Sequence, residues 1–273
     1  MPDLDPAHPL APFKAKLDRA NESVRTLSRG YTEFSQLYPL RADVKVDFQS
    51  GWNTAYIAEH QPIPLSLAVL AGEALYHARS VLEHLVWALV KANHKKPGHY
   101  NSFPILLEVP MEGFAGRTNR PGGGKTPPGA LRGVSARARA RIEQVQPYHA
   151  PVPGDSFLAV LNRMARDDRH HALHSDWVGG AEGDLEHLLQ VPPGVEVTAF
   201  RPLLENGRRL VTGAKLARFR CNPISRQPRV AIRGDLPAFI AFGHRKTGIL
   251  RLDDFHKINE SVAKLVSAFE GFL

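Results

Sequence analysis

A cluster of acidic and imidazole side chains ends one predicted helix and could bind a metal ion. The helix is expected between Asp155 and His174. Carboxylates and imidazoles bind zinc and related ions when they meet inside a helical bundle. The candidate metal ligands are His77, Asp167, His171 and His174, with Glu73 and His84 as further donors. They would make the protein a metal-dependent hydrolase with a divalent cation; alternatively, the histidines only stabilise the C-terminal end of the helix dipole.

Asp168 lies in the middle of the buried face of the same helix, between apolar residues such as Leu161 and Ala172. A buried carboxylate needs a cation or several hydrogen-bond donors. Arg79 lies at the edge of the apolar face of a long helix over 64–92, so we expect Arg79 and Asp168 to pair. The pair would either lock two helices together or form part of a site. The supporting network is expected to contain Glu83, Asp168 and His170.

Positive charge is concentrated in the last third of the chain. The whole chain carries a formal charge of +8, with an isoelectric point near 9.7. Between Glu196 and Arg251, twelve Lys or Arg residues stand against three acids, a net charge of +9. Such a segment attracts polyanions, because neutralising phosphates releases condensed counterions; a solubilising surface is the alternative. The candidate anion-binding residues are Arg209, Arg218, Arg220 and Arg229.

The sequence from Arg79 to His84 has the pattern Arg-x4-His. It resembles the short signature of HEPN domains, all-helical proteins that include many metal-independent ribonucleases. The resemblance implies a homodimer with an RNA-cleaving cleft and a role as a toxin or in phage defence. It also implies that His84 transfers protons and that Arg79 stabilises phosphate charge, roles that suit a group titrating near neutrality and one that stays charged. Ser80 stands where that family often has Asn.

A wider resemblance covers residues 62–175. The segment from Gly72 to Trp87 is similar to a GDALHNLRSALDHLVW pattern of a bacterial protein family without an assigned activity. The later FPI, QPY and DKH elements of that family correspond to Phe103-Pro104-Ile105, Gln146-Pro147-Tyr148 and Asp168-Arg169-His170. Tyr76 and His77 depart from the pattern. The resemblance implies a shared architecture and no particular reaction.

These residues are positioned by elements that the spacing of apolar residues predicts. Spacings of three and four predict helices over 11–38, 64–92, 135–146, 155–174 and 253–272, with Ser135, Asp155 and Asp253 or Asp254 as N-caps. Alternation and turn residues predict a hairpin over 42–60 and strands near 195–200, 209–212, 216–221, 229–232 and 238–242. The expected fold is α+β, mainly α. Residues 1–175 form a helical bundle with the small hairpin, and residues 176–273 form a basic antiparallel β-subdomain closed by helix 253–272.

Composition excludes several classes of protein. The apolar and charged fractions are those of a globular protein, and no segment has the sequence of a membrane span or a signal peptide. Cys221 is the only cysteine, so an internal disulfide is excluded; a cytoplasmic protein is expected.

The preferred hypothesis is a HEPN-like protein that binds RNA or cleaves it without a cofactor, with Arg79 and His84 in the cleft. The alternatives are a non-catalytic binding protein and the metal-dependent hydrolase.

Overall fold

The computed structural model describes residues 11–123, 128–171, 173–180, 185–222, 230–244 and 248–273. It has the expected α+β fold, with 45% helix and 20% strand. The chain divides into two compact units. We call residues 11–27, 68–173 and 243–273 the helical unit, and residues 28–67 and 174–242 the sheet unit. The division after Leu173 lies close to the expected boundary, but the hairpin belongs to the sheet unit and the C-terminal helix to the helical unit.

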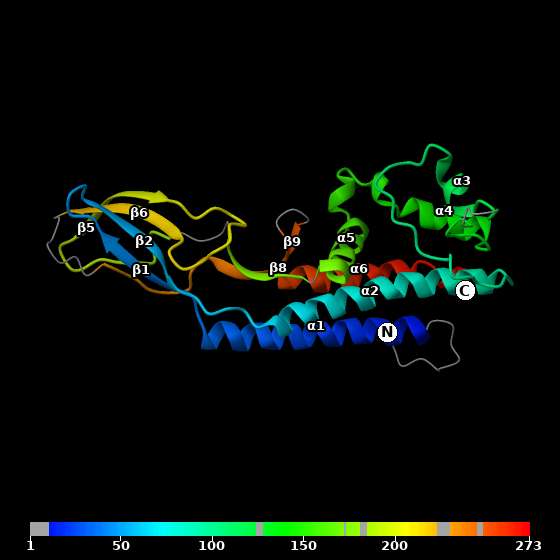
Figure 1. The fold of residues 1–273 in the computed structure, drawn as a ribbon, viewed down its shortest axis with the longest axis horizontal. Helices are drawn as coiled ribbons and strands as arrows, with labels where there is room; N and C mark the ends of the chain where they lie inside the picture. Colours follow the sequence, from blue (N-terminus) through cyan, green and yellow to red (C-terminus); the bar gives the residue numbers. More distant parts are fainter. Residues whose placement is uncertain (1–10, 124–127, 172, 181–184, 223–229, 245–247) are drawn as a thin grey trace. The chain divides into compact units, whose positions relative to one another are not determined.

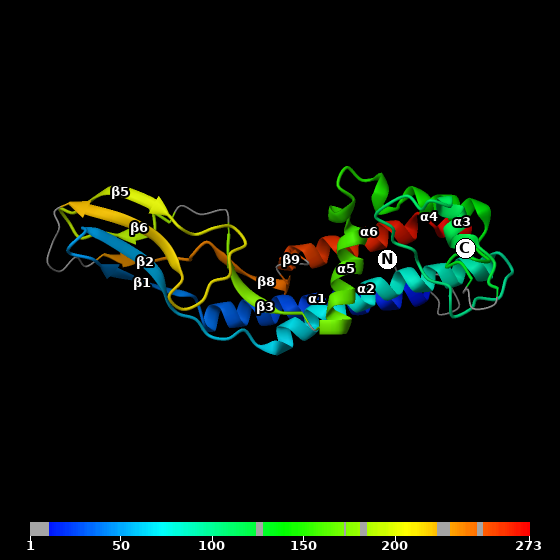
Figure 2. The same ribbon diagram turned by 45° about the horizontal axis from the view of Figure 1, so that its top comes forward.

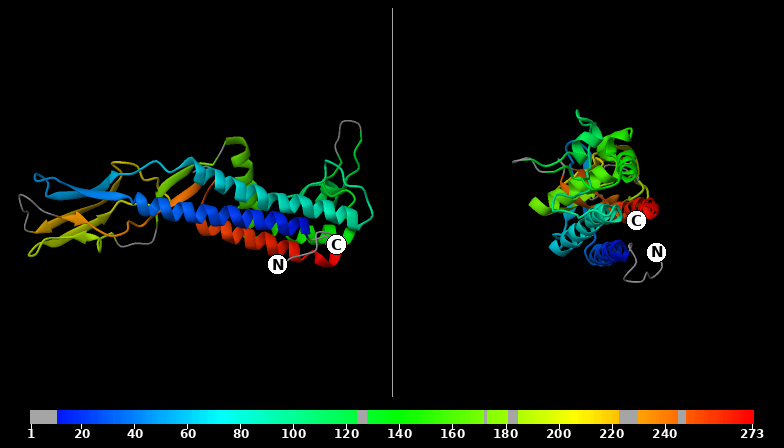
Figure 3. Two further views of the ribbon diagram at one scale, coloured as in Figure 1. Left: turned by 90° about the horizontal axis from the view of Figure 1, so that it is seen from below. Right: turned by 90° about the vertical axis from the view of Figure 1, so that its right-hand side faces the viewer.

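The helical unit is organised around three long helices that lie side by side (Figures 1 and 3). These three are α1 (Ala11–Leu37), α2 (Leu65–Ala92) and α6 (Leu252–Ser267); the other described α-helices are α3 (Gly113–Asn119), α4 (Ala136–Gln144) and α5 (Phe157–His171). Residues 28–37 of α1 and 65–67 of α2 belong to the sheet unit. The apolar residues of the helices recur every three or four positions and form one core. Its fully buried members include Val24, Val81, Leu82, Leu85, Leu161, Val262 and Val266. No helix in the described ranges is long and apolar enough to cross a membrane.

The helix ends show where local sequence was decisive. Ser135 caps α4 as predicted, because its Oγ accepts a hydrogen bond from Ala138 N at 3.3 Å. The predicted Asp155 cap is wrong. Asp155 lies in a short 3-10 turn, and the neighbouring Ser156 Oγ accepts from Ala159 N instead. The predicted cap of α6 is also wrong: the N-cap is Arg251, and Asp254, three residues later, accepts the backbone N–H of Arg251 with its carboxylate. Helix α3 is short and contains two glycines.

The sheet unit contains a four-stranded antiparallel sheet in the order β1-β2-β6-β5 (Figure 2). Its strands are β1 (Arg41–Val46), β2 (Trp52–Glu59), β5 (Glu196–Pro202) and β6 (Lys215–Asn222). The remaining strands are β3 (Ser175–Gly179), β4 (Leu189–Gln190), β7 (Ala231–Ile232), β8 (Ala238–His244) and β9 (Gly248–Leu250). β3 pairs with β8, and β4 pairs with β7. The hairpin is confirmed as β1 and β2. The strand predicted at 209–212 is reduced to an isolated bridge between Arg209 and Val178.

Candidate functional site

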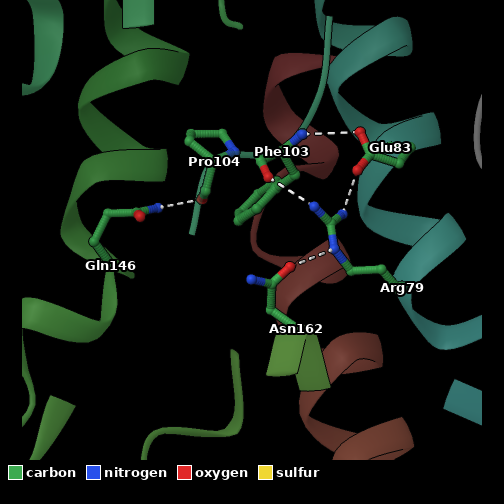
Figure 4. A network of polar contacts seen from close by, with 6 residues as sticks. All are labelled: Arg79, Glu83, Phe103, Pro104, Gln146 and Asn162. Carbon is green, nitrogen blue, oxygen red and sulfur yellow. Dashed lines mark hydrogen bonds and ion pairs between the residues drawn. The ribbon is translucent and has the colours of Figure 1, made fainter. Parts of the chain in front are cut away.

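Arg79 is held by a network inside the helical unit (Figure 4). Its side chain is only 15% exposed, and its Nη1 lies 2.5 Å from Glu83 Oε1, one helical turn along α2. Nη2 donates to the backbone oxygen of Phe103 at 3.0 Å, and Nε donates to Asn162 Oδ1 at 3.4 Å. The backbone N–H of Phe103 in turn donates to Glu83 Oε2 at 3.0 Å. Arg79 and Glu83 therefore bind both the backbone oxygen and the backbone N–H of Phe103, as one neighbouring strand would in a sheet.

Gln146 holds the same segment from its other side. The side chain is 2% exposed, and its Oε1 accepts the N–H of Leu106 at 3.0 Å. Its Nε2 donates to the backbone oxygens of Pro104 and Ile142 at 3.0 and 3.1 Å. The FPI and QPY elements thus meet in the structure. The Gln146 side chain satisfies backbone hydrogen-bonding groups of residues 104–106, which are not part of a described strand. Gln146 therefore has a structural role.

Asp168 does not pair with Arg79, which differs from the expectation. Its carboxyl group packs against Gly72 of α2, where a Cβ would overlap it. Burial raises the pKa of Asp168, and a hydrogen bond from the Leu173 backbone opposes that rise. The physical reason for the difference is local. Glu83 lies one turn from Arg79 on the same helix and forms the ion pair that Asp168 was expected to form. His170 lies exposed near the end of α5.

The raised pKa of Asp168 predicts a pH-dependent stability. A carboxyl group whose pKa is raised by folding stabilises the fold below its ordinary pKa, and this stabilisation is lost as the pH rises through the folded value. Asp168→Asn keeps an acceptor for Leu173 and removes the buried charge. We expect it to raise the melting temperature at pH 7 and to have little effect near pH 3.5. Thermal melts across this range measure the difference; Asp155→Asn, at an exposed site, is the control and should show no such trend.

His84 lies in a different environment from Arg79. It is exposed on α2, and its pKa is lowered by partial burial and by Lys16 of α1, while Glu83 acts in the opposite direction. The pKa of His77 is lowered in the same way, by burial and then by Lys16 and Arg19. Glu83, the ion-pair partner of Arg79, also acts electrostatically on His84, but among the described residues no hydrogen bond or ion pair joins His77 or His84 to the Arg79 network. Within the helical unit, Arg79 and His84 therefore share no described hydrogen bond or ion pair, and their joint role in a cleft stays a prediction.

The proposed metal ligands that the structure describes form no metal site. Across the described residues, no three His, Cys, Asp or Glu side chains come together in a way that could hold a metal ion. His77 has its ring edge against Tyr76, and Asp167 lies on α5. The side chain of His171 lies outside the described part of the structure, and His174 begins the sheet unit.

The sheet unit carries a concentrated group of basic side chains on one face of its four-stranded sheet. Strand β6 alternates between exposed and buried residues, so Arg218 and Arg220 point to the same side. Neighbouring strands are registered so that Arg218 lies opposite both Thr54 and Arg201, and Arg220 lies opposite Trp52. Side chains of directly opposed residues project from the same face. The other face is apolar and buried; it contains Ala55, Ile57, Ala217, Phe219 and Cys221.

Trp52 organises this face. The guanidinium carbons of Arg220, Arg201 and Arg218 lie 4.6, 5.1 and 5.2 Å from the centre of its ring. These distances are typical of cation–π contacts. We call Trp52, Arg201, Arg218 and Arg220 the arginine face. No carboxylate of the described residues lies within 4.0 Å of its three guanidinium groups, so their charge is not neutralised by an ion pair there.

The four predicted anion-binding residues have different outcomes. Arg218 and Arg220 belong to the arginine face. Arg209 forms an ion pair with Asp176 at 2.8 Å, which lowers its capacity to bind another anion. Arg229 lies outside the described residues. Sequence reasoning missed Trp52, because only the pairing of β2 with β6 reveals that the ring lies among arginines.

Comparisons with protein-family models, with curated proteins and with solved structures found no match for this chain. The two resemblances described above therefore stay predictions. What the protein does is inferred from the geometry and chemistry of its own residues.

Proposed function

We propose that this protein binds RNA through the arginine face of its sheet unit. The observation that carries the proposal is the stacking of three guanidinium groups around Trp52 without a described carboxylate partner. Arginine is suited to phosphate because its planar fork can donate two parallel hydrogen bonds to two oxygens. The face therefore presents three phosphate-binding groups within a small area.

Contact with the ring makes the arginines better phosphate ligands. A free arginine side chain loses on the order of 2 kcal/mol of rotamer entropy when it is fixed. Each cation–π contact at an exposed site contributes about 0.5–1 kcal/mol and favours one arrangement before RNA arrives. Part of the ordering cost is then met in the free protein, which favours binding.

Binding is better supported than cleavage. The Arg79 guanidinium is already engaged by Glu83, Phe103 and Asn162, so it has little capacity left for a phosphate. RNA cleavage by Arg79 and His84, and the homodimer cleft that it requires, stay predictions. Because His84 is exposed, His84→Ala is the clean test of cleavage in the presence of EDTA, and light scattering tests the dimer.

The test of binding is a double substitution on the face. We expect Arg218→Gln with Arg220→Gln to weaken binding of a labelled, mixed-sequence 20-nucleotide RNA by about tenfold to a hundredfold. The slope of log affinity against log salt should also become shallower, by about 1.4 for two lost phosphate contacts on a single strand. Fluorescence anisotropy at several salt concentrations measures both quantities.

The matched control is Arg132→Gln with Arg166→Gln. It removes the same charge at exposed positions of the helical unit and should change affinity by less than the face variant does. An equal loss in both double variants would indicate attraction by net charge alone. No RNA binding by the wild-type protein at low salt would contradict the proposal.

A further inference from the structure

An open groove of ≈ 820 Å³ adjoins the arginine face in the sheet unit. It is lined by residues of the β1–β2 hairpin and by Gly213 and Lys215. Thr54 lines the groove and lies opposite Arg218, while Tyr56 lies opposite Lys215. A second depression also contains both Lys215 and Arg218. The groove and the arginine face are therefore parts of one continuous surface.

The groove carries aromatic side chains in a rigid setting. Phe48 lies in the β1–β2 turn with 55% of its surface exposed. The turn around it is fixed by Asp47, whose carboxylate accepts hydrogen bonds from the backbone of Gln49 and from the backbone and hydroxyl of Ser50. These bonds lower the pKa of Asp47, with a smaller contribution from Arg218. Phe48 is thus presented to solvent on an ordered loop.

The remaining lining is chemically mixed. Tyr56 is half-buried on the same side of β2 as Thr54, and Lys45 lies opposite Thr54 in β1. Lys45 and Lys215 add positive charge, while Gln49 and Thr54 offer hydrogen-bond donors and acceptors. Aromatic rings beside cations and amide groups are what an unpaired nucleobase and its phosphate require.

We propose that this groove binds an unpaired nucleobase against Phe48 and Tyr56 while the arginine face holds the neighbouring phosphates. The inference rests on the proposed function and names its substrate class, single-stranded RNA. Bases of a duplex are stacked on one another and paired, so a duplex cannot offer the face of an unpaired base to Phe48 and Tyr56. Trp52 is not the stacking ring, because arginines already surround it.

The experiment compares three probes of equal length: a 12-nucleotide single-stranded RNA, the corresponding duplex, and an oligomer of abasic ribose-phosphate units. Stacking of one base contributes about 1–3 kcal/mol. We therefore expect the wild-type protein to bind the single strand about tenfold more tightly than the abasic oligomer. Phe48→Ala should remove most of this difference and leave binding of the abasic oligomer unchanged.

Phe48 is exposed, so its replacement should leave the fold intact, which circular dichroism checks. Tyr56→Ala should repeat the effect. Trp87→Ala, which removes another exposed aromatic ring on α2, should leave all three affinities unchanged. Equal affinity for the single strand and the abasic oligomer, or no effect of Phe48→Ala, would overturn the inference. If the single strand and the abasic oligomer bind equally and this binding still depends on Arg218 and Arg220, the proposed function stands and the base site is contradicted. If no probe binds, the proposed function and the base site are both contradicted.

Discussion

Replacing Arg79 by alanine is expected to lower the free energy of unfolding by about 3 kcal/mol. The substitution leaves the Glu83 carboxylate without its cation and the Phe103 backbone oxygen without the Nη2 donor that lies 3.0 Å away. Removing Arg79 is costly because its own side chain is largely buried and the remaining Glu83 carboxylate, 36% exposed, is only partly solvated. Arg79→Lys keeps the charge but cannot reproduce the fork, so we expect it to recover only part of the loss. Urea unfolding measures all three proteins.

Arg25→Ala is the matched control. Arg25 pairs with Glu22 in α1, but the two side chains are 66% and 50% exposed, so the expected change is below about 1 kcal/mol. The catalytic hypothesis makes the opposite prediction: Arg79→Ala would keep its stability and lose RNA cleavage. A variant with unchanged urea midpoint would therefore contradict the structural role of Arg79.

Replacing Gln146 by alanine is expected to cost about 2–4 kcal/mol of unfolding free energy, because it leaves two backbone groups unsatisfied. The N–H of Leu106 and the oxygen of Pro104 both bind this side chain. The residue is 2% exposed, so water cannot readily replace it. Gln144→Ala is the control; Gln144 is exposed, and its side chain accepts a hydrogen bond from Arg141, so its replacement should change stability by less than about 0.5 kcal/mol.

The two positions should also be coupled. Arg79 and Gln146 hold the same extended segment from opposite sides (Figure 4). Once one is removed the segment can loosen, and the second loss should cost less than it does alone. Additive losses in the double variant would show that the segment does not act as one element.

Local sequence was sufficient to predict most of the helices of the helical unit. The spacing of apolar residues placed α1, α2, α5 and α6 to within a few residues at most ends, because a helix buries one face at a fixed period. Ser135 was found as a cap for the same reason, since its partner lies three residues away. The same reasoning could have predicted the Arg79–Glu83 pair, because it joins residues one helical turn apart. Asp168, which was expected to be buried, was chosen as the partner instead, and its place against Gly72 depends on how two helices pack.

By itself, the sequence determined that this protein is α+β, that its helices share an apolar core, and that its positive charge is concentrated between Glu196 and Arg251. The sequence placed Arg218 and Arg220 in one predicted strand, and the burial pattern of β6 shows that they share a face. Only the tertiary structure decided what that face contains. Trp52 and Arg220 are far apart in the chain, and the hydrogen bonds between β2 and β6 make them neighbours. Strand pairing over such distances is selected by burial of the opposite face and not by any local preference, which is why the arginine face emerges only in the folded chain.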